Sequence, residues 1–256
     1  MLIILSLTAF VASLLTLFSG FGLGTLFLPV AAIFFPITAA VALTALLHLI
    51  NNLFKLAVMW RYVHVKVALV FGIPALLATI PGAWLLTKIS TWPVWLEGAL
   101  WGINYTITPV KMLIGFLLIF FATAELWAWG KRVKIRAGML PLGGILSGFF
   151  GGLSGHQGAL RSAFLLRAGL SKESFVATGA VIASFVDMSR LVVYGISMNV
   201  ILANSEESLL FIAALAACAG VVVGRLWLKK VTIGFIHKWV AALLYTIGAL
   251  LMVGIL

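Results

Sequence analysis

The chain has 256 residues, of which 64% are hydrophobic and only 9% are charged. A soluble domain carries about 25% charged residues, so this composition excludes a soluble protein and indicates one embedded in a lipid bilayer. The formal net charge is +11. Because basic residues in short loops orient membrane helices, we attribute this charge to topology and expect no nucleic-acid partner.

Apolar stretches long enough to approach the span of a hydrocarbon core recur along the whole chain, which predicts an all-α integral membrane protein. Segments 22–35, 137–152 and 157–168 are too short to cross unaided, so we predict about 8–10 transmembrane segments, some broken or re-entrant. In chain order, the predicted segments are 2–18, 22–35, 38–60, 67–87, 107–127, 137–152, 157–168, 173–195, 207–227 and 236–254.

Basic residues gather in the short loops 61–66, 131–136 and 225–230. The positive-inside rule assigns these loops to the cytoplasm, as in a multi-pass protein of a bacterial or archaeal inner cell membrane. Loops 92–105 and 204–208 contain acidic residues and no basic residue, so we expect them outside. Four aromatic residues of loop 92–105 are expected to anchor this loop in the headgroup layer: Trp92, Trp95, Trp101 and Tyr105.

The two halves of the chain have a similar order of features. At a constant offset of 134 residues, Gly24 aligns with Gly158 and Thr44 with Thr178. Identities are few, and chance is an open alternative. Two similar halves of opposite orientation, with helix breaks at matching positions, are typical of secondary transporters. We therefore predict two inverted repeats, 1–130 and 137–256, joined by the basic cytoplasmic linker 131–136.

The breaks and their surroundings are similar to those of a known family. GLGTLFLP at 22–29 and SGFFGGLSGHQGALRSAFLLRAGLSKESFVATGAV at 147–181 resemble the TauE/SafE family of anion exporters. The resemblance covers about 15–90 and 138–230. It implies a permease for sulfite, a sulfonate such as sulfoacetate, or another small organic anion, without a cofactor.

Two departures from that family leave the substrate open. His156 and Gln157 stand between Gly155 and Gly158, where the family often has consecutive glycines, and Ala163 stands in place of a proline. Polar substitutions at a helix break can change the selectivity of the site.

The two breaks are candidate anion-binding positions. A broken helix exposes backbone N–H groups and a positive dipole end at the start of the next half-helix, and glycine lets a ligand come close to the backbone. The alternative is that the glycines only let helices pack closely. The substrate-binding candidates at the breaks are Gly22, Gly24, Gly155, His156, Gln157 and Gly158.

Arg161 lies one turn into the second short segment, on an apolar background. An arginine inside the membrane is costly unless it faces a partner or a wet cavity, and its planar guanidinium suits an oxyanion. We therefore expect Arg161 to bind substrate. The alternative is an arginine whose side chain extends to the cytoplasmic interface, near Arg167.

Segment 38–60 carries a polar stripe formed by Thr44, His48, Asn51, Asn52 and Lys55. Their spacing of three or four residues puts them along one helix face. We expect His48, Asn51 and Asn52 to bind substrate, and His48 is also a candidate proton carrier. Lys55 is a gating or coupling candidate, unless it extends to the cytoplasmic interface.

Segment 173–195 contains Asp187 and Arg190, which are three residues apart and can pair on one helix face. We interpret them either as a structural ion pair near the outer end of the helix or as a gating or coupling element. Carboxylates are scarce, so we expect proton coupling or simple facilitated flow rather than sodium coupling.

The sequence thus predicts a secondary transporter that exports a small organic or sulfur oxyanion by alternating access at a glycine-framed cationic site. The inside-negative potential would favour export. The alternative is a membrane-embedded enzyme in which His48, His156 and Asp187 provide acid-base chemistry, although we find no metal, nucleophile or cofactor motif. The oligomeric state is left open.

Overall fold

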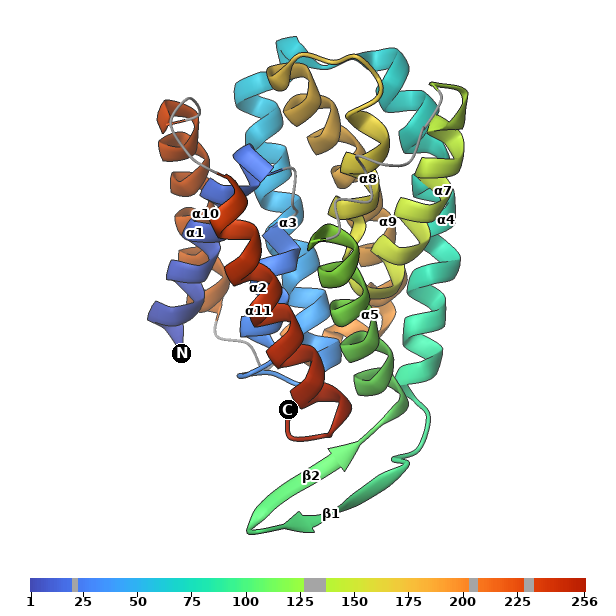
Figure 1. The fold of residues 1–256 in the computed structure, drawn as a ribbon, viewed down its shortest axis with the longest axis vertical. Coiled ribbons are helices and arrows are strands. Elements are labelled where there is room, and N and C mark those ends of the chain that lie inside the picture. The colour runs from blue at the N-terminus through green and yellow to red at the C-terminus, as the bar shows by residue number, and fades with distance from the viewer. Residues whose placement is uncertain (20–22, 127–136, 203–206, 228–232) are drawn as a thin grey trace.

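The computed structural model describes residues 1–19, 23–126, 137–202, 207–227 and 233–256, and these residues form an elongated helical bundle with one β-hairpin (Figure 1). The helices of the first half are α1 (Leu2–Ser19), α2 (Leu23–Ala31), α3 (Ile37–Met59), the 3₁₀ helix η1 (Trp60–Tyr62), α4 (Val65–Ser90) and α5 (Pro109–Leu126). Those of the second half are the 3₁₀ helix η2 (Ala137–Met139), α7 (Leu140–Ser154), α8 (Gln157–Leu165), α9 (Lys172–Leu202), α10 (Glu207–Trp227) and α11 (Ile233–Met252). The strands are β1 (Leu96–Leu100) and β2 (Ile103–Ile107).

The helical membrane architecture predicted from the sequence is confirmed. Four helices in the described part of the chain are long and apolar enough to cross a bilayer, by length and composition, while α1, α5, α7 and α11 contribute shorter apolar stretches. The four are Ile37–Tyr62, Val65–Ser90, Lys172–Gly195 and Ser208–Arg225. Linker 131–136 lies outside the described residues.

The predicted break in the second half is a sharp turn between α7 and α8. Gly155 has a φ of 80° and its backbone N–H donates to the carbonyl of Gly151 at 2.9 Å. Glycine adopts this left-handed conformation without the steric cost that a Cβ brings, so the chain can leave α7 and begin α8 at Gln157. The preceding break, at 20–22, lies outside the described residues.

Glycines on one face of α7 bring its backbone against α4. A Cβ added at Gly148 would lie 2.1 Å from the carbonyl oxygen of Ala75, and one at Gly152 would lie 2.3 Å from that of Thr79. Gly144 follows the same four-residue spacing and would meet the carbonyl of Phe71 at 2.3 Å. Small residues at this spacing let membrane helices approach closely, so these glycines are explained by packing.

Long-range pairing links the two halves of the chain. Helix α1 packs on α10, α4 on α7 and α5 on α11, while α3 packs on α9 in the middle of the bundle. The larger of two hydrophobic clusters includes residues of α1, α2, α3, α5, α10 and α11, and the smaller joins α4 to α7, α8 and α9. The central α3–α9 pair therefore lies where both halves meet (Figure 1).

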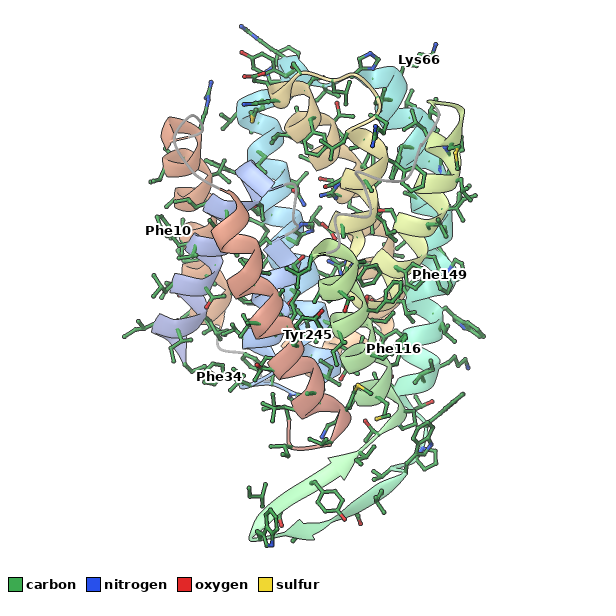
Figure 2. All side chains as sticks on the ribbon, viewed as in Figure 1. Phe10, Phe34, Lys66, Phe116, Phe149 and Tyr245 are labelled. Carbon is green, nitrogen blue, oxygen red and sulfur yellow. The ribbon has the colours of Figure 1, made fainter. Side chains whose placement is uncertain are left out.

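Most of a β-hairpin, 96–107, lies in the segment predicted as an outer loop at 92–105, a correction to the all-helical prediction. Trp101 (φ 52°) and Gly102 (φ 79°) form a two-residue turn with positive φ at both positions, which suits the twist of a hairpin. The hairpin projects beyond one end of the bundle (Figure 1), and Trp101 is 94% exposed. Lys66 lies at the opposite end (Figure 2).

Candidate functional site

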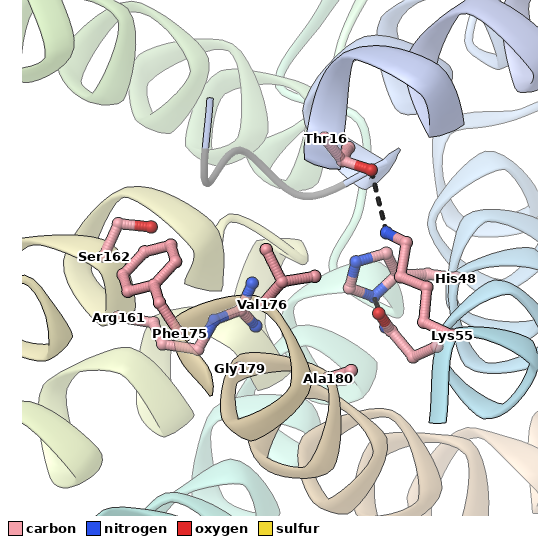
Figure 3. Close-up of a pocket in the computed structure, with 10 residues that line it drawn as sticks. Thr16, His48, Lys55, Arg161, Ser162, Phe175, Val176, Gly179 and Ala180 are labelled. Atoms are coloured by element: carbon pink, nitrogen blue, oxygen red, sulfur yellow. Dashed lines mark hydrogen bonds between the residues drawn. The ribbon is translucent and has the colours of Figure 1, made fainter. Parts of the chain in front are cut away.

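A pocket lies between α1, α3, α8 and α9, with an empty volume of about 380 Å³ that includes open solvent at its mouth. The guanidinium of Arg161, from α8, points across it toward His48 and Lys55 of α3 (Figure 3). The residues lining the pocket are Thr16, His48, Asn52, Lys55, Arg161, Ser162, Phe175, Val176, Gly179 and Ala180.

The pocket wall carries two buried cationic side chains. Lys55 is 5% exposed and its Nζ donates to Oγ1 of Thr16 at 2.8 Å. Arg161 is 7% exposed and its Nη1 donates to Oε1 of Gln157 at 3.3 Å. Both of these partners are neutral, and among the described residues the lining contains no acidic side chain. The pocket therefore presents two basic side chains and is suited to an anion.

Asp187 is fully buried next to the pocket, in contact with two lining residues, His48 and Asn52. Its Oδ1 accepts hydrogen bonds from Arg190 Nε at 3.0 Å, Arg190 Nη2 at 2.7 Å and Gln157 Nε2 at 3.2 Å. Its Oδ2 accepts from His48 Nδ1 at 2.6 Å and from Asn52 Nδ2 at 3.4 Å. The carboxylate thus connects α3, α8 and α9. Its hydrogen bonds offset the free-energy cost of burying a charge.

The predicted pair of Asp187 and Arg190 is present, but its position differs from the expected outer end of a helix. Helix α9 continues to Leu202 rather than ending at 195, so the pair lies near its middle. The longer helix and the contact with His48 account for the difference, because they put the ion pair at the centre of the bundle.

Neighbouring residues of the polar stripe on α3 face different partners. His48 and Asn52, one turn apart, contact Asp187 of α9. Asn51 instead donates from Nδ2 to Oγ of Ser13 at 2.5 Å and to the carbonyl of Ala217 at 3.2 Å. Each step along a helix rotates the side chain by about 100°, so Asn51 joins α3 to α1 and α10, whereas Asn52 lines the pocket.

Gly24 and Gly155, one from each break, lie close to each other, and neither lines the pocket. A Cβ added at Gly24 would lie 3.6 Å from the carbonyl oxygen of Gly155 and 3.2 Å from Cγ2 of Thr44. Gly158 is buried in the first turn of α8 but is not part of the pocket lining. Gly22 lies outside the described residues.

His156 is buried beside the second break, outside the pocket lining. Its Nδ1 donates to the carbonyl of Ser154 at 3.0 Å, and its ring stacks on Phe121 of α5, with centroids 5.8 Å apart. A neutral imidazole that donates from Nδ1 presents only a lone pair at Nε2, so this arrangement does not favour a direct contact with an anion.

Sequence reasoning missed several residues of the pocket. Thr16 and Ser162 supply hydroxyl groups, and Phe175 contributes an aromatic ring. A single hydroxyl near the end of an apolar helix is not part of a repeating polar pattern, so the sequence does not mark Thr16 as a pocket residue. Phe175 is one of 18 phenylalanines in the chain, and nothing in the sequence distinguishes it. Among the described residues, no group of three or more His, Cys, Asp or Glu side chains is placed to hold a metal ion.

The family model described as sulfite exporter TauE/SafE matches residues 5–251. The chain belongs to this family. TauE/SafE proteins are membrane transporters of sulfite-type anions rather than enzymes, so the predicted transporter class is confirmed and the enzyme alternative is excluded. Comparisons with curated proteins and with solved structures found no match.

Proposed function

We propose that this TauE/SafE protein is a secondary transporter that exports a small oxyanion, such as sulfite, an organosulfonate or a small carboxylate, through the pocket between α1, α3, α8 and α9. The observation that carries the proposal is that two buried basic side chains, Lys55 and Arg161, line one pocket that has no acidic lining among the described residues. His48, Asn52 and Thr16 add polar groups able to orient the oxygens of an anion.

The position of the pocket supports a binding site open toward the cytoplasm. His48, Asn52 and Lys55 lie on the second half of α3, which ends at the basic loop 61–66. The α9 residues of the lining, from Phe175 to Ala180, lie in the first turns of that helix. The backbone N–H of His64 donates to Oγ1 of Thr178 at 2.9 Å, so the loop after α3 contacts the first turns of α9.

The order of helices supports an origin from two inverted repeats, 1–130 and 137–256. In each half, a helix is followed by the short helix α2 or α8, then by the long helix α3 or α9, and then by two further helices. If α1 corresponds to α7 and α4 to α10, the α1–α10 and α4–α7 contacts are equivalent. The α3–α9 and α5–α11 contacts then lie on the axis that relates the repeats.

The contacts around Asp187 suggest a gate on the outer side of the pocket. In this conformation Asp187 holds His48 of α3, Gln157 of α8 and Arg190 of α9 together. Alternating access would require these contacts to rearrange so that the anion can leave outward. His48 lines the pocket and contacts Asp187, and so we assign it the role of proton carrier if transport is proton-coupled.

The proposal is tested by sulfite efflux from proteoliposomes that contain the purified chain. An inside-negative potential drives anions outward by ~2.3 kcal/mol per charge per 100 mV, so efflux should accelerate when that potential is imposed. Protein-free vesicles measure leakage. Efflux no faster than in protein-free vesicles, for sulfite, methanesulfonate and acetate alike, would contradict the proposed function.

A further inference from the structure

The buried titratable side chains of the central region divide into two groups. Arg190 and His48 both contact Asp187, at 2.7 Å and 2.6 Å, so they share a carboxylate. Lys55 and Arg161 form no ion pair with any described acidic residue, and the side chains to which they donate hydrogen bonds, Thr16 and Gln157, are neutral. The pocket therefore holds two cationic groups whose charge the described part of the protein does not balance by direct contact.

Asp187 makes no direct contact with either of them. Its Oδ1 already accepts three hydrogen bonds, from Arg190 and Gln157, and its Oδ2 accepts from His48 and Asn52. A carboxylate has about four lone-pair positions, so its oxygens are saturated in this conformation. An anion that enters the pocket can therefore supply a directly contacting counter-charge to both Lys55 and Arg161.

We propose that the pocket selects doubly charged oxyanions, with Lys55 and Arg161 each balancing one negative charge, so that sulfite binds as SO₃²⁻ rather than as hydrogensulfite. This inference rests on the proposed function and adds the charge state of its substrate. An unbalanced charge in a low-dielectric site is costly, and a monoanion leaves one of the two cations without a partner. A dianion satisfies both.

The two cations have complementary roles. The planar guanidinium of Arg161 can engage two oxygens of a pyramidal SO₃ group side by side. The ammonium group of Lys55 acts as a compact point charge, and its hydrogen bond to Thr16 holds it at the opposite wall (Figure 3). Arg161 therefore recognises the shape shared by sulfite and sulfonates, and Lys55 distinguishes between their charges.

The test compares sulfite with methanesulfonate, which share an SO₃ group but carry two charges and one. Their dissociation constants are measured by calorimetry on the purified protein at one mildly alkaline pH, where sulfite is fully dianionic. Because a dianion gives up more hydration, the decisive quantity is how a variant changes the ratio of the two constants. Lys55→Met should weaken sulfite binding by roughly 30-fold and leave methanesulfonate binding almost unchanged.

Control variants separate charge from folding. Lys55→Gln can still donate to Thr16 and should shift the ratio as Lys55→Met does, while Lys55→Arg keeps the charge and should preserve the ratio. Lys66→Met removes an exposed lysine and should change nothing. An unchanged ratio in Lys55→Gln, or equal weakening of both anions, overturns the charge selection and leaves the proposed function standing. A wild-type protein that binds neither anion overturns the proposed function itself.

Discussion

The Nδ1 atom of His48 lies 2.6 Å from Oδ2 of Asp187, and this contact joins α3 to α9 at the centre of the bundle. The two side chains are 2% and 0% exposed. Asp187 also forms an ion pair with Arg190, so one carboxylate holds both neighbouring side chains. Asp187 therefore links α3 to α9 and also forms the ion pair with Arg190.

Replacement of Asp187 by asparagine should lower both stability and transport. Arg190 would remain buried without a counter-charge, a situation that costs about 3–5 kcal/mol. Thermal unfolding in detergent measures the effect. Glu173→Gln, at an exposed carboxylate on the same helix, is the matched control and should unfold like the wild type. The double variant Asp187→Leu with Arg190→Met should recover stability but not sulfite efflux. An Asp187→Asn protein as stable as the wild type would contradict the proposed role of Asp187.

Asn51 and Asn52 are adjacent in sequence but should respond differently to alanine. Asn51→Ala removes the hydrogen bonds to Ser13 and Ala217, so it should destabilise the protein by about 1–3 kcal/mol and leave sulfite affinity unchanged. Asn52→Ala removes a pocket residue and should weaken sulfite binding instead. Unfolding curves and titrations of the two variants give the comparison. An equal loss of sulfite affinity in Asn51→Ala and Asn52→Ala would contradict the placement of Asn51 outside the pocket.

Gly148→Ala should destabilise the protein although alanine favours a helix over glycine. The added Cβ would lie 2.1 Å from the carbonyl oxygen of Ala75, which forces α4 and α7 apart, and overpacking of this kind costs about 1–3 kcal/mol. Gly195→Ala is the control, because a Cβ there meets nothing within 4 Å. We expect a lower midpoint of thermal unfolding for Gly148→Ala alone. Equal midpoints would show that close packing of α4 on α7 is not required.

Much of the fold could be predicted from hydropathy, because each apolar stretch between Gly, Pro and charged residues became a helix. The hairpin at 96–107 could not be, since its turn is built on Trp101 and Gly102 rather than on the Asn-Gly or Asp-Gly pairs that mark such turns. The length of α9 was also underestimated: it continues through Gly195, where the apolar pattern suggested an end.

The candidate site was predicted in part. His48, Asn52, Lys55 and Arg161 stood out because polar side chains are costly in the membrane, and they meet in one pocket. Periodicity could not tell which neighbour each polar residue of α3 would face, so Asn51 was grouped with Asn52. The contact between His48 and Asp187 spans 139 residues, a distance over which one sequence contains no pairing information.

The central claim is that the transported anion binds in the pocket lined by Arg161 and His48. Potential-driven sulfite efflux from proteoliposomes tests it most directly, with Arg161→Ala, His48→Ala and, as a control, Arg167→Ala at an exposed arginine just beyond α8. We expect Arg161→Ala to reduce efflux by about 10-fold or more, because a hydrogen bond to a charged group contributes about 1.5–3 kcal/mol. His48→Ala should also slow it, and Arg167→Ala should match the wild type. Wild-type rates in both Arg161→Ala and His48→Ala would contradict the assignment of this pocket.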